Sequence, residues 1–182
     1  MDALIAEFGQ IGLDPADNEF ERLCTSIINQ QLSTASAAAV RERVVDTLDG
    51  TVTPSTVLAA SPAALRDAGL SRTKVEYMKN AAEAFQDRDL TRSGLADEPN
   101  DAVIDELTQI KGVGEWTAHM YLLFVLGRED IFPIGDLGIR NGIQQLYGDG
   151  AELSRDEMIE IAAKWRPYRS YGTRYIWRAY EA

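Results

Sequence analysis

The sequence predicts an all-α protein, and three observations support this prediction. Apolar residues recur at spacings of three and four along much of the 182-residue chain. Thr53-Pro54 and Ser61-Pro62 each place a cap residue before a proline, which is typical of a helix start. No segment alternates polar and apolar residues for long enough to form a strand. We therefore expect about ten helices and no sheet.

The first half of the chain contains six predicted helices, each marked by a cap residue, a proline or an apolar stripe. Asn18 and Glu21 have the spacing of a capping box, and Ser33 and Ser71 each precede an apolar run. The expected ranges are residues 2–8, 18–29, 33–48, a short helix from 54, a second short helix from 62 to 69, and 71–88. Residues 91–99 are expected to form a loop.

The second half begins with two predicted helices, 100–110 and 115–126. The first is amphipathic and the second is nearly all apolar. A helix is then expected from Asp136 to Tyr147. Ser154 and Glu157 form a full capping box for a helix that ends near Trp165, and the last helix covers 168–180.

The segment Lys111-Gly112-Val113-Gly114 separates the helices 100–110 and 115–126. Two glycines let the main chain adopt positive φ and leave no bulky side chains in the way. We therefore expect the N–H groups of Gly112, Val113 and Gly114 to point outward at a helix N-terminus, where they would bind phosphate.

Composition limits the classes of site. The chain contains one cysteine, Cys24, which excludes a disulfide framework and a four-cysteine iron–sulfur cluster. A single histidine, His119, leaves no histidine-pair metal site. The first twenty residues lack a basic start and an apolar run, and no stretch approaches a membrane span, so the sequence favours a cytoplasmic protein.

The net charge is −11, which is unusual for a protein that seeks phosphate. The basic residues are fourteen arginines and only four lysines. An acidic, lysine-poor surface indicates adaptation to very high salt, where a Debye length of about 3 Å at about 1 M removes long-range repulsion. The alternative is that the chain does not bind nucleic acid. Residues 164–182 are basic, which favours a phosphate-facing end.

The hairpin motif Ile110-Lys-Gly112-Val113-Gly114-Glu-Trp-Thr117-Ala118 resembles that of the helix-hairpin-helix DNA glycosylases. The segments 27–33, 69–78 and 165–177 extend the resemblance over nearly the whole chain. The closest branch is 3-methyladenine DNA glycosylase II, in a minimal form without the N-terminal β-rich domain. The resemblance implies a single monomeric glycosylase unit, 1–182, with two helical lobes. One lobe covers about 21–130 and includes the hairpin 100–126, and the other combines about 1–20 with 131–182.

Asp136, in Pro133-Ile-Gly-Asp136-Leu-Gly-Ile-Arg140, is the predicted catalytic residue. Breaking an N-glycosidic bond builds positive charge on the sugar, and a carboxylate stabilises that charge. Residue type alone favours a simple helix N-cap, because aspartate is among the best caps. The resemblance shifts the interpretation to catalysis, and the two roles are compatible.

The resemblance also implies a pocket for the flipped base. Trp177 matches a tryptophan that stacks on the base, and indole is a good partner for a cationic alkylated purine. Trp116 stands where bifunctional relatives carry a nucleophilic lysine, which predicts a monofunctional enzyme. Met120 and Tyr121 are expected beside Trp116 in the same pocket. Plain core packing is the alternative for Trp116 and Trp177.

Gln30, Gln31 and Leu32 match the segment that fills the gap left by a flipped base. Thr117 is expected near a phosphate. By position, the main-chain carbonyls of Thr108, Ile110 and Gly112 would hold a monovalent cation, either Na⁺ or K⁺, as in the family. The resemblance implies no other cofactor.

Together these features predict a monofunctional glycosylase that acts on alkylated bases in double-stranded DNA. Two alternatives remain. The first is a non-catalytic helix-hairpin-helix module that only grips the DNA backbone. The second is a glycosylase for another damaged or deaminated base.

Overall fold

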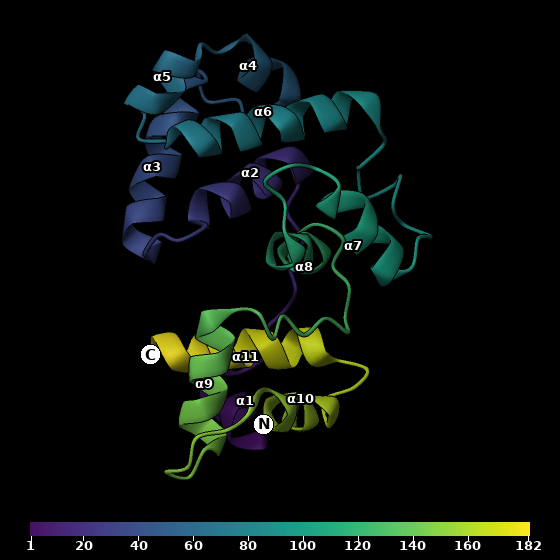
Figure 1. Ribbon diagram of the computed structural model, residues 1–182. Helices are drawn as coiled ribbons and strands as arrows, with labels where there is room; N and C mark the ends of the chain where they lie inside the picture. The colour runs from purple at the N-terminus through teal and green to yellow at the C-terminus, as the bar shows by residue number, and fades with distance from the viewer. The chain divides into compact units, whose positions relative to one another are not determined.

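The computed structural model describes residues 1–182 and contains eleven α-helices and no strand (Figure 1). The helices are α1 Asp2–Phe8, α2 Glu19–Asn29, α3 Thr34–Thr47, α4 Pro54–Ala59, α5 Pro62–Asp67, α6 Arg72–Asp87, α7 Asn100–Thr108, α8 Glu115–Phe124, α9 Leu137–Tyr147, α10 Arg155–Ala163 and α11 Arg169–Glu181. The all-α prediction is confirmed. None of the helices is long and apolar enough to cross a membrane.

The predicted cap residues set most of the helix starts. The side chain of Asn18 accepts a hydrogen bond from the amide of Glu21, and Ser154 and Glu157 form the complete capping box. The two hairpin helices end earlier than predicted, at Thr108 and Phe124. After α7 the chain tightens, because the amide of Ile110 bonds three residues back to Leu107.

The chain divides into two compact units. Unit 2 is Ala16–Tyr121, and unit 1 joins Met1–Pro15 to Leu122–Ala182. The sequence placed the boundaries near residues 20 and 130. Residues 128–130 belong to unit 1 because they bond to the start of α11. Ser170 donates its amide to Glu129 and its hydroxyl to the Arg128 carbonyl, and Arg169 pairs with Asp130.

Unit 2 is organised around α6, which packs against α2, α4 and α5. Its buried side chains include Met78, which faces a core that also contains Leu23, Ile27 and Leu65. The ammonium of Lys79 donates to the carbonyls at the end of α4, including that of Ala60 at 2.9 Å. These carbonyls would otherwise lack partners at a helix C-terminus.

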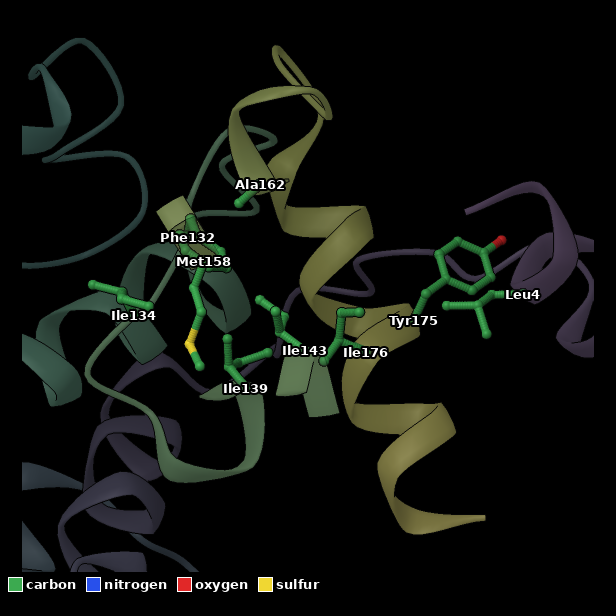
Figure 2. Packing of buried hydrophobic residues seen from close by; sticks show 9 residues of the cluster. All are labelled: Leu4, Phe132, Ile134, Ile139, Ile143, Met158, Ala162, Tyr175 and Ile176. Carbon is green, nitrogen blue, oxygen red and sulfur yellow. The ribbon is translucent and has the colours of Figure 1, made fainter. Parts of the chain in front are cut away.

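Unit 1 is built on the packing of α9 against α11 (Figure 2). Ile139 and Ile143 from α9 meet Ile176 from α11, and all three are fully buried. Gly142 allows the close approach, since a Cβ there would lie 2.5 Å from the Ile176 side chain. Leu4 of α1 packs beside Tyr175 at the edge of the same core, as Figure 2 shows.

Candidate functional site

Side chains of α6 pack against the turn between α7 and α8. Gly112 has a φ of 104°, in the left-handed region that favours glycine, and a Cβ there would overlap the ring of Tyr77 from α6. Asn80, one turn further along α6, donates to the carbonyl of Lys111 at 3.1 Å. Gly114 is exposed, and a Cβ there would meet nothing within 4 Å. The turn therefore has a packed inner side at Gly112 and an open side at Gly114.

The sequence predicted that all three amides of this turn would be available to a ligand. The structure shows that one of them is not. The amide of Val113 donates to the Ile110 carbonyl at 2.9 Å, and the Val113 side chain is buried. The prediction of a bare N–H at Val113 is therefore wrong. The amides of Gly112 and Gly114 make no hydrogen bond within the protein, so two of the three predicted donors remain for an anion.

Gln30 ties the end of α2 to the hairpin. Its side-chain amide donates to the Gly112 carbonyl at 2.9 Å and to the Thr117 hydroxyl at 3.1 Å. Thr117 is only 2% exposed. Both residues thus have structural partners inside unit 2, and the roles of Gln30 in filling a gap and of Thr117 beside a phosphate stay predictions.

Gln31 and Leu32 form the exposed part of the same segment. Gln31 has a φ of 57°, and Leu32 is 40% exposed. Beneath them, the ammonium of Lys74 donates to the carbonyls of Ile28 at 2.6 Å and Gln30 at 2.7 Å. Burial lowers the pKa of Lys74, and the two carbonyls compensate for the lost water. The structure therefore places two predicted DNA-contacting segments, 30–32 and 112–114, side by side, and side chains of α6 contact both of them.

The predicted pocket residues of α8 differ in exposure. Trp116 is half-buried, whereas Met120 is 4% exposed and Tyr121 is 1% exposed. The hydroxyl of Tyr121 donates to the Leu90 carbonyl at 2.6 Å, and its ring meets Phe85 edge-on. Burial raises the pKa of Tyr121. These contacts make Tyr121 a core residue, and its place in a base pocket stays a prediction.

In unit 1, Asp136 is the N-cap of α9. Its Oδ1 atom accepts a hydrogen bond from the amide of Ile139 at 2.9 Å, as a cap does. The same atom accepts a second bond, also 2.9 Å, from the indole Nε1 of Trp177. The structure thus brings together the predicted catalytic carboxylate and the predicted stacking tryptophan.

Trp177 is itself supported by residues that the sequence analysis did not single out. Phe124 stacks on the indole with a centroid separation of 5.8 Å and an interplanar angle of 17°. The guanidinium of Arg174 lies over the Phe124 ring, 5.5 Å from its centroid. Gly138 lies against the indole edge. Gly138 was visible in the sequence as a glycine inside a helix, but nothing in the sequence indicated Phe124.

The basic residues near the C-terminus are largely engaged within unit 1. Arg169 makes hydrogen bonds to both carboxylate oxygens of Asp130, at 2.6 and 3.0 Å, and this pairing lowers the pKa of Asp130. Arg174 donates to the Leu13 carbonyl, and Arg178 lies over the ring of Phe8. The basic end therefore contributes to packing, and the sequence interpretation of a phosphate-facing end loses its main support.

Two other titratable residues have plain structural roles. Burial raises the pKa of Cys24 and lowers the pKa of His119. No group of three or more histidine, cysteine or acidic side chains is arranged to hold a metal ion.

At the hairpin, the carbonyls of Ile110 and Gly112 each accept one hydrogen bond. A carbonyl oxygen has a second lone pair, so both remain chemically able to contact a cation.

Residues 24–167 match the family described as HhH-GPD superfamily base excision DNA repair protein. The Bacillus subtilis protein YfjP, whose name describes a DNA-3-methyladenine glycosylase, is 32% identical over 162 residues, which are 85% of this chain and 56% of that protein. DNA-3-methyladenine glycosylase 1 of Schizosaccharomyces pombe is 30% identical over 168 residues, 87% of this chain and 71% of that protein. The chain thus spans little more than half the length of its Bacillus subtilis relatives.

Solved structures give the same picture. The Schizosaccharomyces pombe 3-methyladenine DNA glycosylase in complex with abasic DNA superimposes with a TM-score of 0.89 at 28% identity, covering 100% of this chain and 91% of that one. The fold resemblance therefore extends over both units, including α9 and α11, which carry Asp136 and Trp177.

Proposed function

Because the chain belongs to the HhH-GPD superfamily of base excision DNA repair proteins, we propose that it is a monofunctional DNA glycosylase for alkylated bases. On this proposal it binds double-stranded DNA that contains a damaged base. It hydrolyses the N-glycosidic bond and leaves an abasic site. It works at the chromosomal DNA of the cell and does so as a monomer.

The observation that carries the proposal is the placement of Asp136. Its carboxylate sits at the N-terminus of α9 and is fixed by two N–H donors. When the glycosidic bond breaks, the base takes the bonding electrons and the sugar becomes cationic. A fixed carboxylate stabilises that cation and orients the attacking water, which adds to the sugar carbon and gives up a proton to the carboxylate.

An alkylated purine suits a site with one carboxylate. Such a base is positively charged before cleavage, so it departs as a neutral molecule and needs no acid to protonate it. The aromatic side chain next to Asp136 is the indole of Trp177, which favours a cationic ring. Trp116 and Met120, which belong to unit 2, stay predictions from the family resemblance. Trp116 also occupies the place of a nucleophilic lysine, which favours hydrolysis without strand cleavage.

The hairpin supplies the proposed DNA grip. The unbonded amides of Gly112 and Gly114 suit a phosphate, and exposed Gln31 and Leu32 suit the gap left by a flipped base. We further propose a Na⁺ or K⁺ ion at the carbonyls of Thr108, Ile110 and Gly112. Such an ion would add positive charge beside the same phosphate.

Product analysis tests the proposal. Duplex DNA treated with a methylating agent is incubated with the protein, and released bases are identified by mass spectrometry. We expect free methylated purines, strands that break only after heat or alkali, and no covalent adduct after borohydride. A borohydride-trapped adduct would contradict monofunctional hydrolysis and make Lys111, beside the hairpin glycines, the first residue to examine. Binding without base release would favour a non-catalytic DNA-binding module, and release of other bases would identify a different glycosylase.

A further inference from the structure

We propose that Trp177 is a positioning residue for Asp136, and that Gly138 favours this pairing by leaving room for the indole. The inference rests on the proposed function, because it concerns the carboxylate assigned there as catalytic. It adds to the expected stacking role of Trp177 a second role that acts through a hydrogen bond.

Asp136 accepts hydrogen bonds from donors on two different helices. The bond from the Ile139 amide is local, since any aspartate N-cap on α9 would make it. The bond from the Trp177 indole comes from α11, which is about forty residues away in sequence. With both donors on the same oxygen, the carboxylate is tied to its own helix and to the facing helix. This arrangement fixes where the negative charge lies before any substrate binds.

Trp177 cannot easily leave this position. Phe124 covers one face of the indole at 5.8 Å between centroids, and Arg174 packs on Phe124 in turn. A flipped base could therefore stack only on the opposite face. Moving the ring to follow a base would break both the stacking and the bond to Asp136. The indole is thus built as a fixed support for the carboxylate.

Gly138 leaves little clearance beside Asp136 and Trp177. A Cβ on this residue would lie 3.2 Å from Asp136 Oδ1, 3.3 Å from Trp177 Cδ1 and 3.4 Å from Trp177 Nε1. The φ of Gly138 is not in the left-handed region, so the backbone does not require glycine. Alanine is the better helix former, and only the nearby carboxylate and indole oppose it. Gly135, on the other side of Asp136, has no atom within 4 Å of such a Cβ.

Two variants and two controls separate positioning from stacking. Trp177→Phe keeps an aromatic ring but removes the N–H donor, and Gly138→Ala keeps both residues but crowds them. Gly135→Ala adds the same methyl group in open space, and Trp165→Phe removes an indole elsewhere in unit 1. The measurements are the single-turnover rate of base release at saturating protein, the Kd for abasic DNA, and the Tm.

We expect Trp177→Phe to lower the saturating rate by roughly 10- to 100-fold, the size of a lost hydrogen bond to a charged group, and Gly138→Ala to lower it by a smaller factor, because it shifts the pair without removing the donor. Their Kd values should stay within about threefold of wild type, and both controls should keep the wild-type rate. A higher protein concentration at half-saturation on the damaged substrate, with a normal saturating rate for Trp177→Phe, would indicate stacking alone and overturn the inference.

A second readout does not depend on catalysis. The indole N–H resonance of Trp177, assigned by its loss in Trp177→Phe, should exchange slowly with solvent in the wild type. It should exchange faster in Gly138→Ala but not in Gly135→Ala. Rapid exchange in the wild type would overturn the inference and leave the proposed function standing. Slow exchange in a protein that releases no base would support the pairing and refute the glycosylase function.

Discussion

The hairpin in unit 2 and the Asp136 cluster in unit 1 are built in different ways. Around the hairpin, side chains hold main-chain atoms. Gln30 bonds to the Gly112 carbonyl, Asn80 to that of Lys111, and Lys74 to those of Ile28 and Gln30. Around Asp136, side chains position another side chain. The Trp177 indole donates a hydrogen bond to the carboxylate, and the Phe124 ring stacks on the indole.

This difference matches the two tasks that we propose. A phosphate is recognised by N–H groups whose positions depend only on the backbone, so the supporting residues fix the backbone. A developing cation is stabilised by one charge, so the supporting residues fix that charge. Mutations in the two regions should therefore affect different quantities.

The largest effect is expected at Asp136. Asp136→Asn keeps the size of the side chain and much of its capping ability but removes the charge. We expect base release to fall by at least about 100-fold, with the fold and the affinity for abasic DNA preserved. Circular dichroism, Tm and a binding titration accompany the rate measurement. A near-wild-type rate would remove Asp136 from the mechanism.

The next effect distinguishes the two glycines of the hairpin. Gly112→Ala places a methyl group against Tyr77 at a φ of 104°, so we expect a loss of about 1–3 kcal/mol in the free energy of unfolding. Gly114→Ala is the matched control and should leave the Tm nearly unchanged, because the space there is open. Equal effects of the two substitutions would contradict the packed and open sides described here.

Added salt should raise both the stability of the protein and its rate of base release. A net charge of −11 opposes binding to DNA and crowds carboxylates on the surface, and screening relieves both penalties. We expect the Tm and the rate of base release to rise from tens of millimolar toward molar KCl. Sucrose at matched osmolality is the control for non-ionic stabilisation. A steady fall of both quantities from the lowest salt upward would refute adaptation to high salt.

The smallest effect is expected at Asp130, whose carboxylate is held by Arg169 at the start of α11. The pKa of Asp130 is lowered in the folded state, so this pairing stabilises the protein above the unfolded pKa of about 3.9. The stability is lost as the pH falls through the lower folded value. Asp130→Asn should lower the Tm by about 1–3 °C near pH 7 and by less below about pH 3. The exposed Asp67→Asn is the control, and a pH-independent difference would refute the charge argument.

Much of the fold could be predicted from local chemistry. The helix starts were predictable from their cap residues, because a cap bonds to an amide within the first turn of its own helix. These caps are Asn18, Ser33, Ser71 and Ser154. The helix that begins at Arg169 was predicted to within a residue. The ends of α7 and α8 were not predicted, and that of α7 depends on the tight turn that follows, where the Ile110 amide bonds to the Leu107 carbonyl.

The candidate site was predictable in part. The type and position of Asp136 and the glycines of the hairpin pointed to their roles through their own chemistry and a family resemblance. The partners of these residues could not be predicted. Gln30 looked like a gap-filling side chain because nothing in the sequence shows that its amide reaches Gly112, 82 positions away. Phe124 and Gly138 matter only because α8, α9 and α11 bring them to Trp177.

The central claim is that the hairpin grips DNA while Asp136 performs the chemistry. The most direct test is the single-turnover rate of base release as a function of protein concentration, for wild type, Asp136→Asn and Gly114→Asp. Gly114 accepts the first helical bond of α8, so aspartate there should cap the helix and preserve stability, yet repel a phosphate. We predict that Gly114→Asp needs at least about tenfold more protein but reaches the wild-type plateau. Asp136→Asn should half-saturate like wild type at a plateau at least about 100-fold lower. A lowered plateau for Gly114→Asp together with a normal plateau for Asp136→Asn would contradict the account.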